Sequence, residues 1–374
     1  MICSLPWVHL SLQARDDAVG IRPCCWYLHS SVKKEFPNQW LTYNDVKRIG
    51  LTEASNSQVL KKTRQDMLAG KHVSGCQSCY DSEKIGNFSM RQNFNSKFKL
   101  DNLTEDFLHL KYIEISLDNI CNLECKMCSS GFSTKLKKRD ELVGYEVSPT
   151  LAYDLDLLDT INLDNVELVK VLGGEPFASK NHEKLLDKFQ DLSKISFIYN
   201  TNCTIIPTDN IIKKMKSMKG LHFIISCDSI YKYNDYQRWG SKFEDIIANA
   251  ITLKKTFSNI NHFMFLNVYS LLNLNTYNIS KKWFLKNGFK TSSEWERGEL
   301  SAWHAPQWYE DWILEENDCD EVRNYFSYRQ YNENKWKQFL KFINITDKLY
   351  NTKLKDYNPE LARKLEIHES KGII

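Results

Sequence analysis

The chain has 374 residues, of which 42% are hydrophobic and 26% are charged. This is the composition of a folded globular protein, and it excludes a disordered chain. Its 50 Lys and Arg residues are nearly balanced by 47 Asp and Glu, and a net charge of +3 gives no support to nucleic-acid binding. No apolar run reaches the ~18–20 residues of a membrane span, and the N-terminus lacks the pattern of a secretion signal. We therefore expect a cytoplasmic protein that does not associate with membranes.

The order of predicted elements divides the chain into three parts. Residues 1–100 are irregular in pattern, apart from a helical stretch over 57–68. From about 108, strand-like apolar runs alternate with helical patterns, which predicts βα units and a parallel sheet, either barrel-like or doubly wound. The predicted strands are 112–117, 166–172, 195–199, 221–226 and 263–269, and the predicted helices are 181–192, 209–219, 242–257 and 276–287. A further amphipathic helix is predicted over 335–350, as a cap on the main domain.

Cysteine is the most informative residue type. The chain has 11 cysteines, and eight of them lie in the first 128 residues. In a reducing cytosol, closely spaced cysteines more often bind metal or perform chemistry than form disulfides. The distribution predicts metal centres in the N-terminal third of the chain.

The strongest single motif follows the first strand of the repeating region. Cys121, Cys125 and Cys128 have C-x3-C-x2-C spacing. Three thiolates on one loop can bind three irons of a cubane iron–sulfur cluster and leave the fourth iron open for catalysis. The alternative is a zinc site, but structural zinc prefers four ligands, and no fourth Cys or His follows closely.

These residues resemble the cluster motif of the radical SAM superfamily, with Met127 at the apolar position before the last cysteine. The second predicted strand ends in Gly173-Gly174-Glu175-Pro176, which is similar to the family's GGEP motif. The resemblance implies that this segment contacts the amino group of S-adenosylmethionine. Two glycines allow close backbone approach, and Glu175 supplies an acceptor for an ammonium.

Three further segments extend the resemblance. Asn202 lies in a stretch similar to the family's T-N-G-T, in which Cys203 replaces the usual glycine and its permissive φ. Ser226 and Asp228 lie in a segment whose polar side chains approach the ribose or substrate in the family, although they are equally suited to cap the next helix. Arg238 matches an arginine of SPASM and twitch-type members. Cys203 and Cys227 are expected to be buried small residues rather than ligands.

The N-terminal cysteines form a second group. Cys76 and Cys79 are a chelating pair, and Cys3 with Cys24 or Cys25 completes four thiolates. The segment resembles the twitch module, which holds an auxiliary [4Fe–4S] cluster, in the order seen in phage-type twitch radical SAM proteins. Cys24 is preferred because the Pro-Cys step matches that module. A four-cysteine zinc ribbon is the alternative.

The resemblance implies a partial (β/α)6 TIM-type barrel between a small cysteine-rich N-terminal module and a helical C-terminal cap. We expect the domain limits 1–105, 106–300 and 301–374. The short basic run over 135–139 is interpreted as a solvated helix face.

The expected function is that of a radical SAM enzyme. Such an enzyme reductively cleaves S-adenosylmethionine to a 5′-deoxyadenosyl radical, which abstracts hydrogen from the substrate. By the resemblance, the substrate is most simply a peptide or protein, and the electron donor a flavodoxin or ferredoxin. A sugar, nucleoside or other small molecule is the alternative substrate, and a non-catalytic iron–sulfur or zinc redox sensor is the rival class. No hydrogen-donor residue stands out among Cys203, Cys227, Cys319 and the tyrosines.

Overall fold

The computed structural model describes residues 1–14, 20–28, 34, 39–84, 86–296, 300–327 and 329–370. Its eight strands form a mostly parallel sheet in the order β2-β1-β3-β4-β5-β6-β7-β8. β2 is antiparallel to β1, whereas the pairs β1–β3, β3–β4, β4–β5 and β7–β8 are parallel. The strands are β1 His9–Leu12, β2 Ile21–Arg22, β3 Tyr112–Ser116, β4 Leu168–Leu172, β5 Ser196–Thr201, β6 Gly220–Ser226, β7 Ile260–Tyr269 and β8 Lys290–Trp295. The α/β class expected from the sequence is confirmed.

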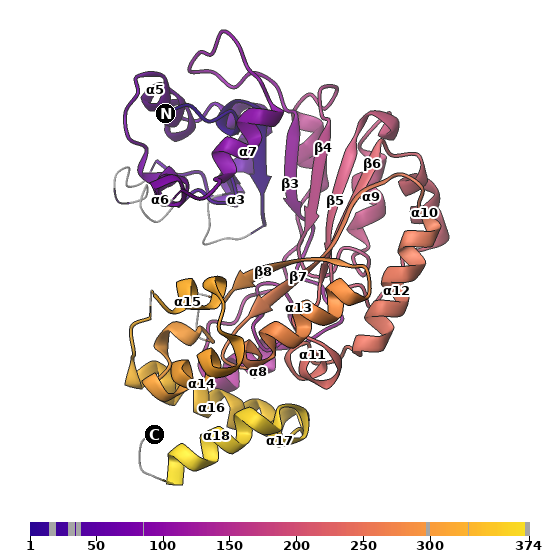
Figure 1. Cartoon of the computed structure of the whole chain (residues 1–374). Coiled ribbons are helices and arrows are strands. Elements are labelled where there is room, and N and C mark those ends of the chain that lie inside the picture. The colour runs from indigo at the N-terminus through magenta and orange to yellow at the C-terminus, as the bar shows by residue number, and fades with distance from the viewer. Residues whose placement is uncertain are drawn as a thin grey trace. The chain divides into compact units, whose positions relative to one another are not determined.

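Helices occur between the strands and fill the C-terminal part of the chain (Figure 1). Before β3 lie α1 Leu5–Val8, α3 Tyr43–Ile49, α4 Leu51–Ser55, α5 Gln58–Leu68, α6 Gln77–Lys84 and α7 Met90–Lys97. Between β3 and β8 lie α8 Lys137–Val143, α9 Asn181–Asp187, α10 Asp209–Lys216, α11 Tyr231–Gln237, α12 Phe243–Thr256 and α13 Tyr277–Lys286. After β8 lie α14 Gln307–Asn317, α15 Asp320–Phe326, α16 Glu333–Tyr350, α17 Leu354–Tyr357 and α18 Pro359–Ser370. No helix of the described residues is long and apolar enough to cross a bilayer.

All five strands predicted from apolar runs are present as β3 to β7, to within a few residues at their ends. β1 and β8 were not expected from the sequence. β1 has only four residues and follows directly on α1, so its alternating pattern is too short to stand out, and β8 is mostly polar. β1 pairs in parallel with β3, so part of the N-terminal region belongs to the sheet, in contrast to the irregular structure expected there.

The chain divides into two compact units. Unit 1 comprises Met1–Asp118, Leu151–Tyr199 and Asp209–Leu221, and unit 2 comprises Asn119–Thr150, Asn200–Thr208 and His222–Ile374. Each unit is built from separated segments, and the limits at 105 and 300 expected for functional modules stay a prediction.

The sheet of unit 1 has one mostly apolar face. Ile113, Val169 and Phe197 lie opposite one another on β3, β4 and β5, and none of them is exposed. The next residues along β3 and β4, Glu114 and Lys170, are also opposite each other and form an ion pair of 3.0 Å on the other face. Because side chains alternate between faces along a strand, one face is hydrophobic core and the other carries charge.

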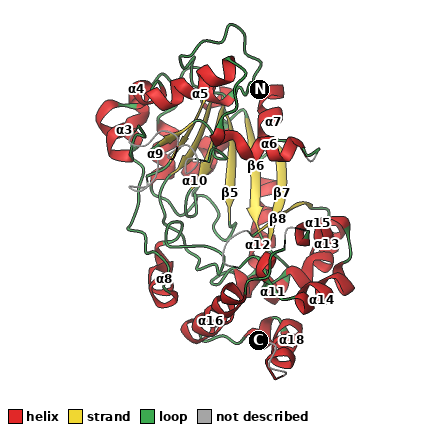
Figure 2. Ribbon diagram, turned by 90° about the vertical axis from the view of Figure 1, so that its left-hand side faces the viewer, coloured by secondary structure: helices red, strands yellow, loops and turns green. Residues whose placement is uncertain are grey.

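The C-terminal helices of unit 2 pack around a second core. α14, α16 and α18 lie near the C-terminus in both views (Figure 2). α16 buries one side, because its apolar residues recur at helical spacing. The buried residues of this helix are Trp336, Phe339, Phe342, Ile343, Thr346 and Tyr350. Asn332 caps the helix by accepting a hydrogen bond from the backbone N–H of Lys335. The helical C-terminal part expected from the sequence is confirmed.

Candidate metal and cofactor site

The loop that follows β3 carries Cys121, Cys125 and Cys128, and its cysteine-bearing part lies in unit 2. Cys125 is buried and the other two are half-buried, and a turn joins the Cys128 N–H to the Cys125 carbonyl at 3.1 Å. Burial, followed by the negative charge of Cys121, raises the pKa of the Cys128 thiol to about 11. Burial also raises the pKa of Cys125, and Cys128 and Cys121 add to it. The three thiols are therefore close enough to repel one another as thiolates, and a bound cationic group would relieve that repulsion.

Two polar side chains point N–H groups at these sulfurs. Arg238 Nη1 lies 3.9 Å from Cys125 Sγ, and Asn202 Nδ2 lies 3.7 Å from Cys121 Sγ. The backbone N–H of Leu123 adds a third contact, 3.5 Å from Cys121 Sγ. Donors facing sulfur stabilise its thiolate form and tune a metal bound to it. Two residues expected near the cofactor are thus placed beside the cysteine loop.

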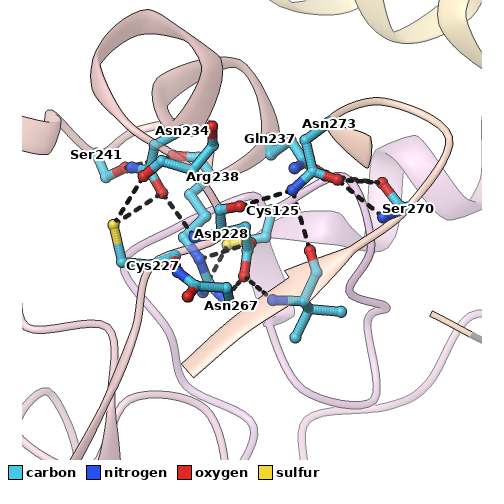
Figure 3. Close-up of polar contacts among 12 residues, drawn as sticks. Cys125, Cys227, Asp228, Asn234, Gln237, Arg238, Ser241, Asn267, Ser270 and Asn273 are labelled. Carbon is cyan, nitrogen blue, oxygen red and sulfur yellow. Dashed lines mark hydrogen bonds and ion pairs between the residues drawn. The ribbon is translucent and has the colours of Figure 1, made fainter. Parts of the chain in front are cut away.

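Arg238 is held by Asp228, which immediately follows a cysteine at the end of β6 (Figure 3). Arg238 Nε and Nη2 lie 2.8 and 2.9 Å from the two carboxylate oxygens of Asp228. The same carboxylate accepts a hydrogen bond of 3.0 Å from the Val268 backbone N–H. Asp228 is fully buried, so its side chain orients the guanidinium. Asp228 does not cap the following helix, because the N-cap of α11 is Ile230.

Asn202 and Ser226 occupy different environments. The Asn202 side chain binds Asn122 in the cysteine loop, with Nδ2 donating to Asn122 Oδ1 at 3.0 Å. Ser226 is half-buried at the last position of β6.

Cys203 adopts a left-handed backbone with φ of 57°, so it keeps the conformation that glycine favours at a cost of ~1 kcal/mol. Cys203 and Cys227 are both fully buried, as expected for small core residues.

Arg139 corrects one expectation from the sequence. The basic run over 135–139 is not wholly a solvated face, because Arg139 is fully buried. Its guanidinium donates to the carbonyls of Cys125 at 3.2 Å and Lys126 at 3.0 Å, and it also binds the Cys128 carbonyl. Asp140 balances the charge and accepts from Ser130 N–H at 2.6 Å. Arg139 thus fixes the backbone of the cysteine loop, and no sequence motif distinguishes it from its exposed lysine neighbours.

The Gly173–Pro176 segment belongs to unit 1 and follows β4. Gly173 has a φ of 126°, and a Cβ at this position would lie 2.5 Å from the Asp118 carbonyl oxygen, so only glycine fits. Gly174 N–H donates to the same carbonyl at 2.8 Å. Glu175 is buried, and its Oε1 accepts from the Phe177 N–H at 3.2 Å. The segment is a preformed turn that holds a buried carboxylate.

Four of the N-terminal cysteines line one cavity in unit 1. Cys3, Cys24, Cys76 and Cys79 all contribute to its wall, together with mostly apolar side chains such as Met67, Tyr27 and Met90. Burial raises the pKa of Cys3 to about 12, with Cys79 adding to it, and raises that of Cys76, with Cys3 and Cys79 adding. The structure therefore gathers thiols that are separated by up to 76 positions in the sequence.

Cys25 differs from its neighbour Cys24. It does not line the cavity, and a hydrogen bond with Cys24, opposed by burial, lowers its pKa. Glu114 and Lys170, on the charged face of the sheet, lie close enough to influence Cys25. Cys24 therefore lines the cavity, and its assignment as a ligand in preference to Cys25 stays a prediction.

Arg91 supplies a cation at the edge of this cavity. Its Nε lies 2.9 Å from Glu83 Oε1, and its Nη1 donates to the Ile2 carbonyl at 3.1 Å.

In the described part of the chain, no three Cys, His, Asp or Glu side chains converge tightly enough to hold a single metal ion. A cubane differs from a single ion because each thiolate binds a different iron, which keeps the sulfurs further apart.

Comparison with known proteins agrees with this site. Residues 115–269 match the model of the Radical SAM superfamily, and this range includes the cysteine loop, Gly173–Pro176 and Arg238. The match identifies a radical SAM domain in the chain. No curated protein matches the chain.

Several solved structures are similar to parts of the chain. A histidine-tagged form of anSMEcpe with bound AdoMet is 18% identical, with a TM-score of 0.39, and the match covers 52% of this chain and 54% of that one. Streptococcus suis SuiB bound to precursor peptide SuiA is 14% identical, with a TM-score of 0.36 over 77% of this chain and 64% of that one. TYW1 with a lysine-pyruvate adduct is 12% identical, with a TM-score of 0.31 over 68% and 81%. The chain spans about half the length of anSMEcpe. At these scores we assign no substrate from the similarity.

Proposed function

We propose that Cys121, Cys125 and Cys128 bind three irons of a [4Fe–4S] cluster, and that the chain uses it to cleave S-adenosylmethionine reductively. The observation that carries the proposal is the cysteine loop itself. Three thiols lie on one loop, and N–H groups of Arg238 and Asn202 face the sulfurs of two of them. A site with three cysteine ligands leaves one iron without a protein ligand.

When bound and reduced by the electron donor, the cluster would pass one electron to S-adenosylmethionine, whose S–C5′ bond would break to give methionine and a 5′-deoxyadenosyl radical that takes hydrogen from the substrate. The protein contributes binding and orientation. Arg139 fixes the loop backbone, Asp228 orients Arg238, and Arg238 places a positive charge at Cys125. We assign the amino group of S-adenosylmethionine to Gly173–Pro176, with Glu175 as an acceptor. Ser226 is proposed on the resemblance alone to lie near the ribose or substrate.

The four thiols of Cys3, Cys24, Cys76 and Cys79 are proposed to bind an auxiliary [4Fe–4S] cluster in a twitch-like module. Their common cavity supports this proposal. Four thiolates would saturate the cluster, which then serves electron transfer or structure.

The substrate is proposed to be a peptide or protein, on the resemblance of the N-terminal module to twitch modules. A sugar, nucleoside or other small molecule is the alternative. The electron donor is proposed to be a flavodoxin or ferredoxin, and the compartment the cytoplasm.

The test is reductive cleavage of S-adenosylmethionine. The protein is reconstituted anaerobically with iron and sulfide, reduced with dithionite and supplied with S-adenosylmethionine. We expect release of 5′-deoxyadenosine and methionine. Absence of 5′-deoxyadenosine from a preparation shown to hold its clusters would contradict the proposal and favour the redox-sensor class.

A further inference from the structure

A lysine is buried within the cysteine loop, between Cys125 and Cys128. The side chain of Lys126 has an exposed fraction of 0%. Its Nζ donates to Thr346 Oγ1 at 3.1 Å, and it lies 3.8 Å from Asp347 Oδ1 and 4.1 Å from the centre of the Tyr236 ring. These contacts replace the hydration shell of an ammonium only in part, so its burial is costly. A methionine of similar length would fill the same space without that cost, and stability alone does not explain the charge.

Asp347 connects this ammonium to two other segments. Its Oδ1 accepts from Tyr236 OH at 2.8 Å and from Thr352 Oγ1 at 2.7 Å. Its Oδ2 accepts from the Leu354 N–H at 2.7 Å, at the start of α17. A single carboxylate therefore joins α16, the turn after it and α11. The Asp347 carboxylate also lies near the Lys126 ammonium, so it connects the cysteine loop to these same segments.

The backbone of the cysteine loop runs beside the segment that carries Arg238. Glu124 N–H donates to the Trp239 carbonyl at 2.9 Å, and Lys126 N–H donates to the Gln237 carbonyl at 2.7 Å. Arg238 lies between these two carbonyls and reaches Cys125 Sγ. The Lys126 side chain packs on Tyr236 in the same segment. The approach of Arg238 to Cys125 therefore depends on how these two segments are held together.

We propose that Lys126, Tyr236 and Asp347 form a positioning junction, which sets the cysteine loop against the Arg238 segment and ties both to α16. The C-terminal helix α16 lies outside residues 115–269, yet it then forms part of the cluster site. This inference rests on the proposed function, because it assigns the junction a role in holding a cluster. The three residues act through the loop and through Arg238.

The main test uses Lys126→Met, which removes the ammonium and keeps the length of the side chain. Iron should be lost to a chelator about tenfold faster than from the wild type, because a buried hydrogen bond to a charged group is lost. The midpoint potential of the cluster should fall, because the Lys126 ammonium is removed and Arg238 is held less firmly beside Cys125. Arg238→Gln, which removes a positive charge at Cys125, should lower the potential as well. Lys337→Met is the matched control, since Lys337 lies on α16 with its side chain 60% exposed, and we expect wild-type values for it.

Tyr236→Phe is a milder variant that removes one hydroxyl. It tests the positioning role of the junction by itself if Lys126→Met does not fold. It should shift the chelation rate and the potential in the same directions by smaller amounts. Wild-type chelation rates and potentials in both variants would overturn the junction. Faster loss of iron to the chelator with an unchanged midpoint potential would contradict the role of the junction in placing Arg238.

Hydrogen exchange on the cluster-free protein separates this inference from the proposed function. Amides of residues 121–130 and 237–239 should exchange faster together in Tyr236→Phe, whereas Lys337→Met should not change them. Unchanged exchange in Tyr236→Phe would overturn the junction whether or not the wild type binds iron. Failure of the wild type to bind iron would instead contradict the proposed function.

Discussion

The two groups of cysteines surround their thiols in different ways. The loop of unit 2 has three thiols, and side-chain N–H groups from Arg238 and Asn202 face two of them. The cavity of unit 1 has four thiols, and most of its wall is apolar. Under the proposed function each group binds a cubane of four irons, and this difference of one thiol leaves one iron open to another ligand in the loop and none in the cavity. The loop is suited to binding a reactant, and the cavity is suited to holding a closed group.

The arginines beside the two groups of cysteines also differ in what they contact. Arg238 is fixed by a buried carboxylate and reaches a cysteine sulfur directly. Arg91, at the cavity, is engaged by Glu83 and by the Ile2 carbonyl. A fixed cation that contacts a thiolate affects the electron affinity of a cluster, whereas one paired at the edge mainly holds its surroundings in place.

The largest effect is expected from removing one thiol of the loop. Cys125→Ala should abolish release of 5′-deoxyadenosine and remove about four irons per chain, because two thiolates hold a cubane poorly. Iron analysis and the cleavage assay measure both. Cys319→Ala is the matched control, because this half-buried cysteine belongs to neither group. Retained cleavage in Cys125→Ala would show that the loop is not the reactive site.

Removing two thiols of the cavity should have a smaller effect on cleavage. Cys76→Ala combined with Cys79→Ala should lower iron from about eight to about four per chain, the difference of one cubane. Some cleavage of S-adenosylmethionine should persist, since the loop keeps its three thiols. The N-terminal part should also become less stable, because metal ligation there contributes folding energy. Zinc in place of the lost iron would identify a zinc ribbon, and loss of all iron would show that the two centres are not independent.

The adjacent cysteines Cys24 and Cys25 allow a sharper comparison within the cavity. Cys24→Ser should lower the iron content as the double variant does, because Cys24 lines the cavity. Cys25→Ser should leave about eight irons per chain, the content of two cubanes. Iron and sulfide analysis of the two variants, prepared side by side, measures this difference. The reverse result would make Cys25 the ligand.

The smallest effect is expected at the turn after β4. Glu175→Ala should leave both clusters intact and weaken binding of S-adenosylmethionine by about tenfold, because an acceptor for its ammonium is lost. Equilibrium binding to the reconstituted protein measures the affinity. Glu183→Ala, at the exposed start of α9, serves as the control. Unchanged affinity in Glu175→Ala would place the ammonium contact elsewhere.

The sequence predicted much of the fold where apolar patterns are long. The strands β3 to β7 were expected because their apolar runs exceed what a turn or an exposed helix carries. β1 and β8 were missed because they are short or polar, and their pairing with neighbours determines their conformation. α16 was expected because the residues over 335–350 have an amphipathic pattern at helical spacing.

The candidate ligands could be predicted because cysteine spacing is local, whereas the groups that support them are not. Arg139 contacts the loop from α8 and Asp347 lies near Lys126 from α16, and their identity as common charged residues gives no signal in the sequence. The gathering of Cys3 with Cys76 depends on the packing of α1 and the turn before α6. The role of Asp228 as partner of Arg238 likewise follows from the tertiary contact and not from the motif.

Electron paramagnetic resonance of the reduced protein tests the central contrast most directly. Spectra are recorded with and without S-adenosylmethionine, for the wild type and for Cys76→Ala combined with Cys79→Ala. We expect two cluster signals in the wild type, only one of which changes when S-adenosylmethionine is added. In the double variant, the signal that changes should be the one that remains. If S-adenosylmethionine changes neither signal, or changes the one lost with Cys76 and Cys79, the assignment of an open site to the loop and a closed site to the cavity is contradicted.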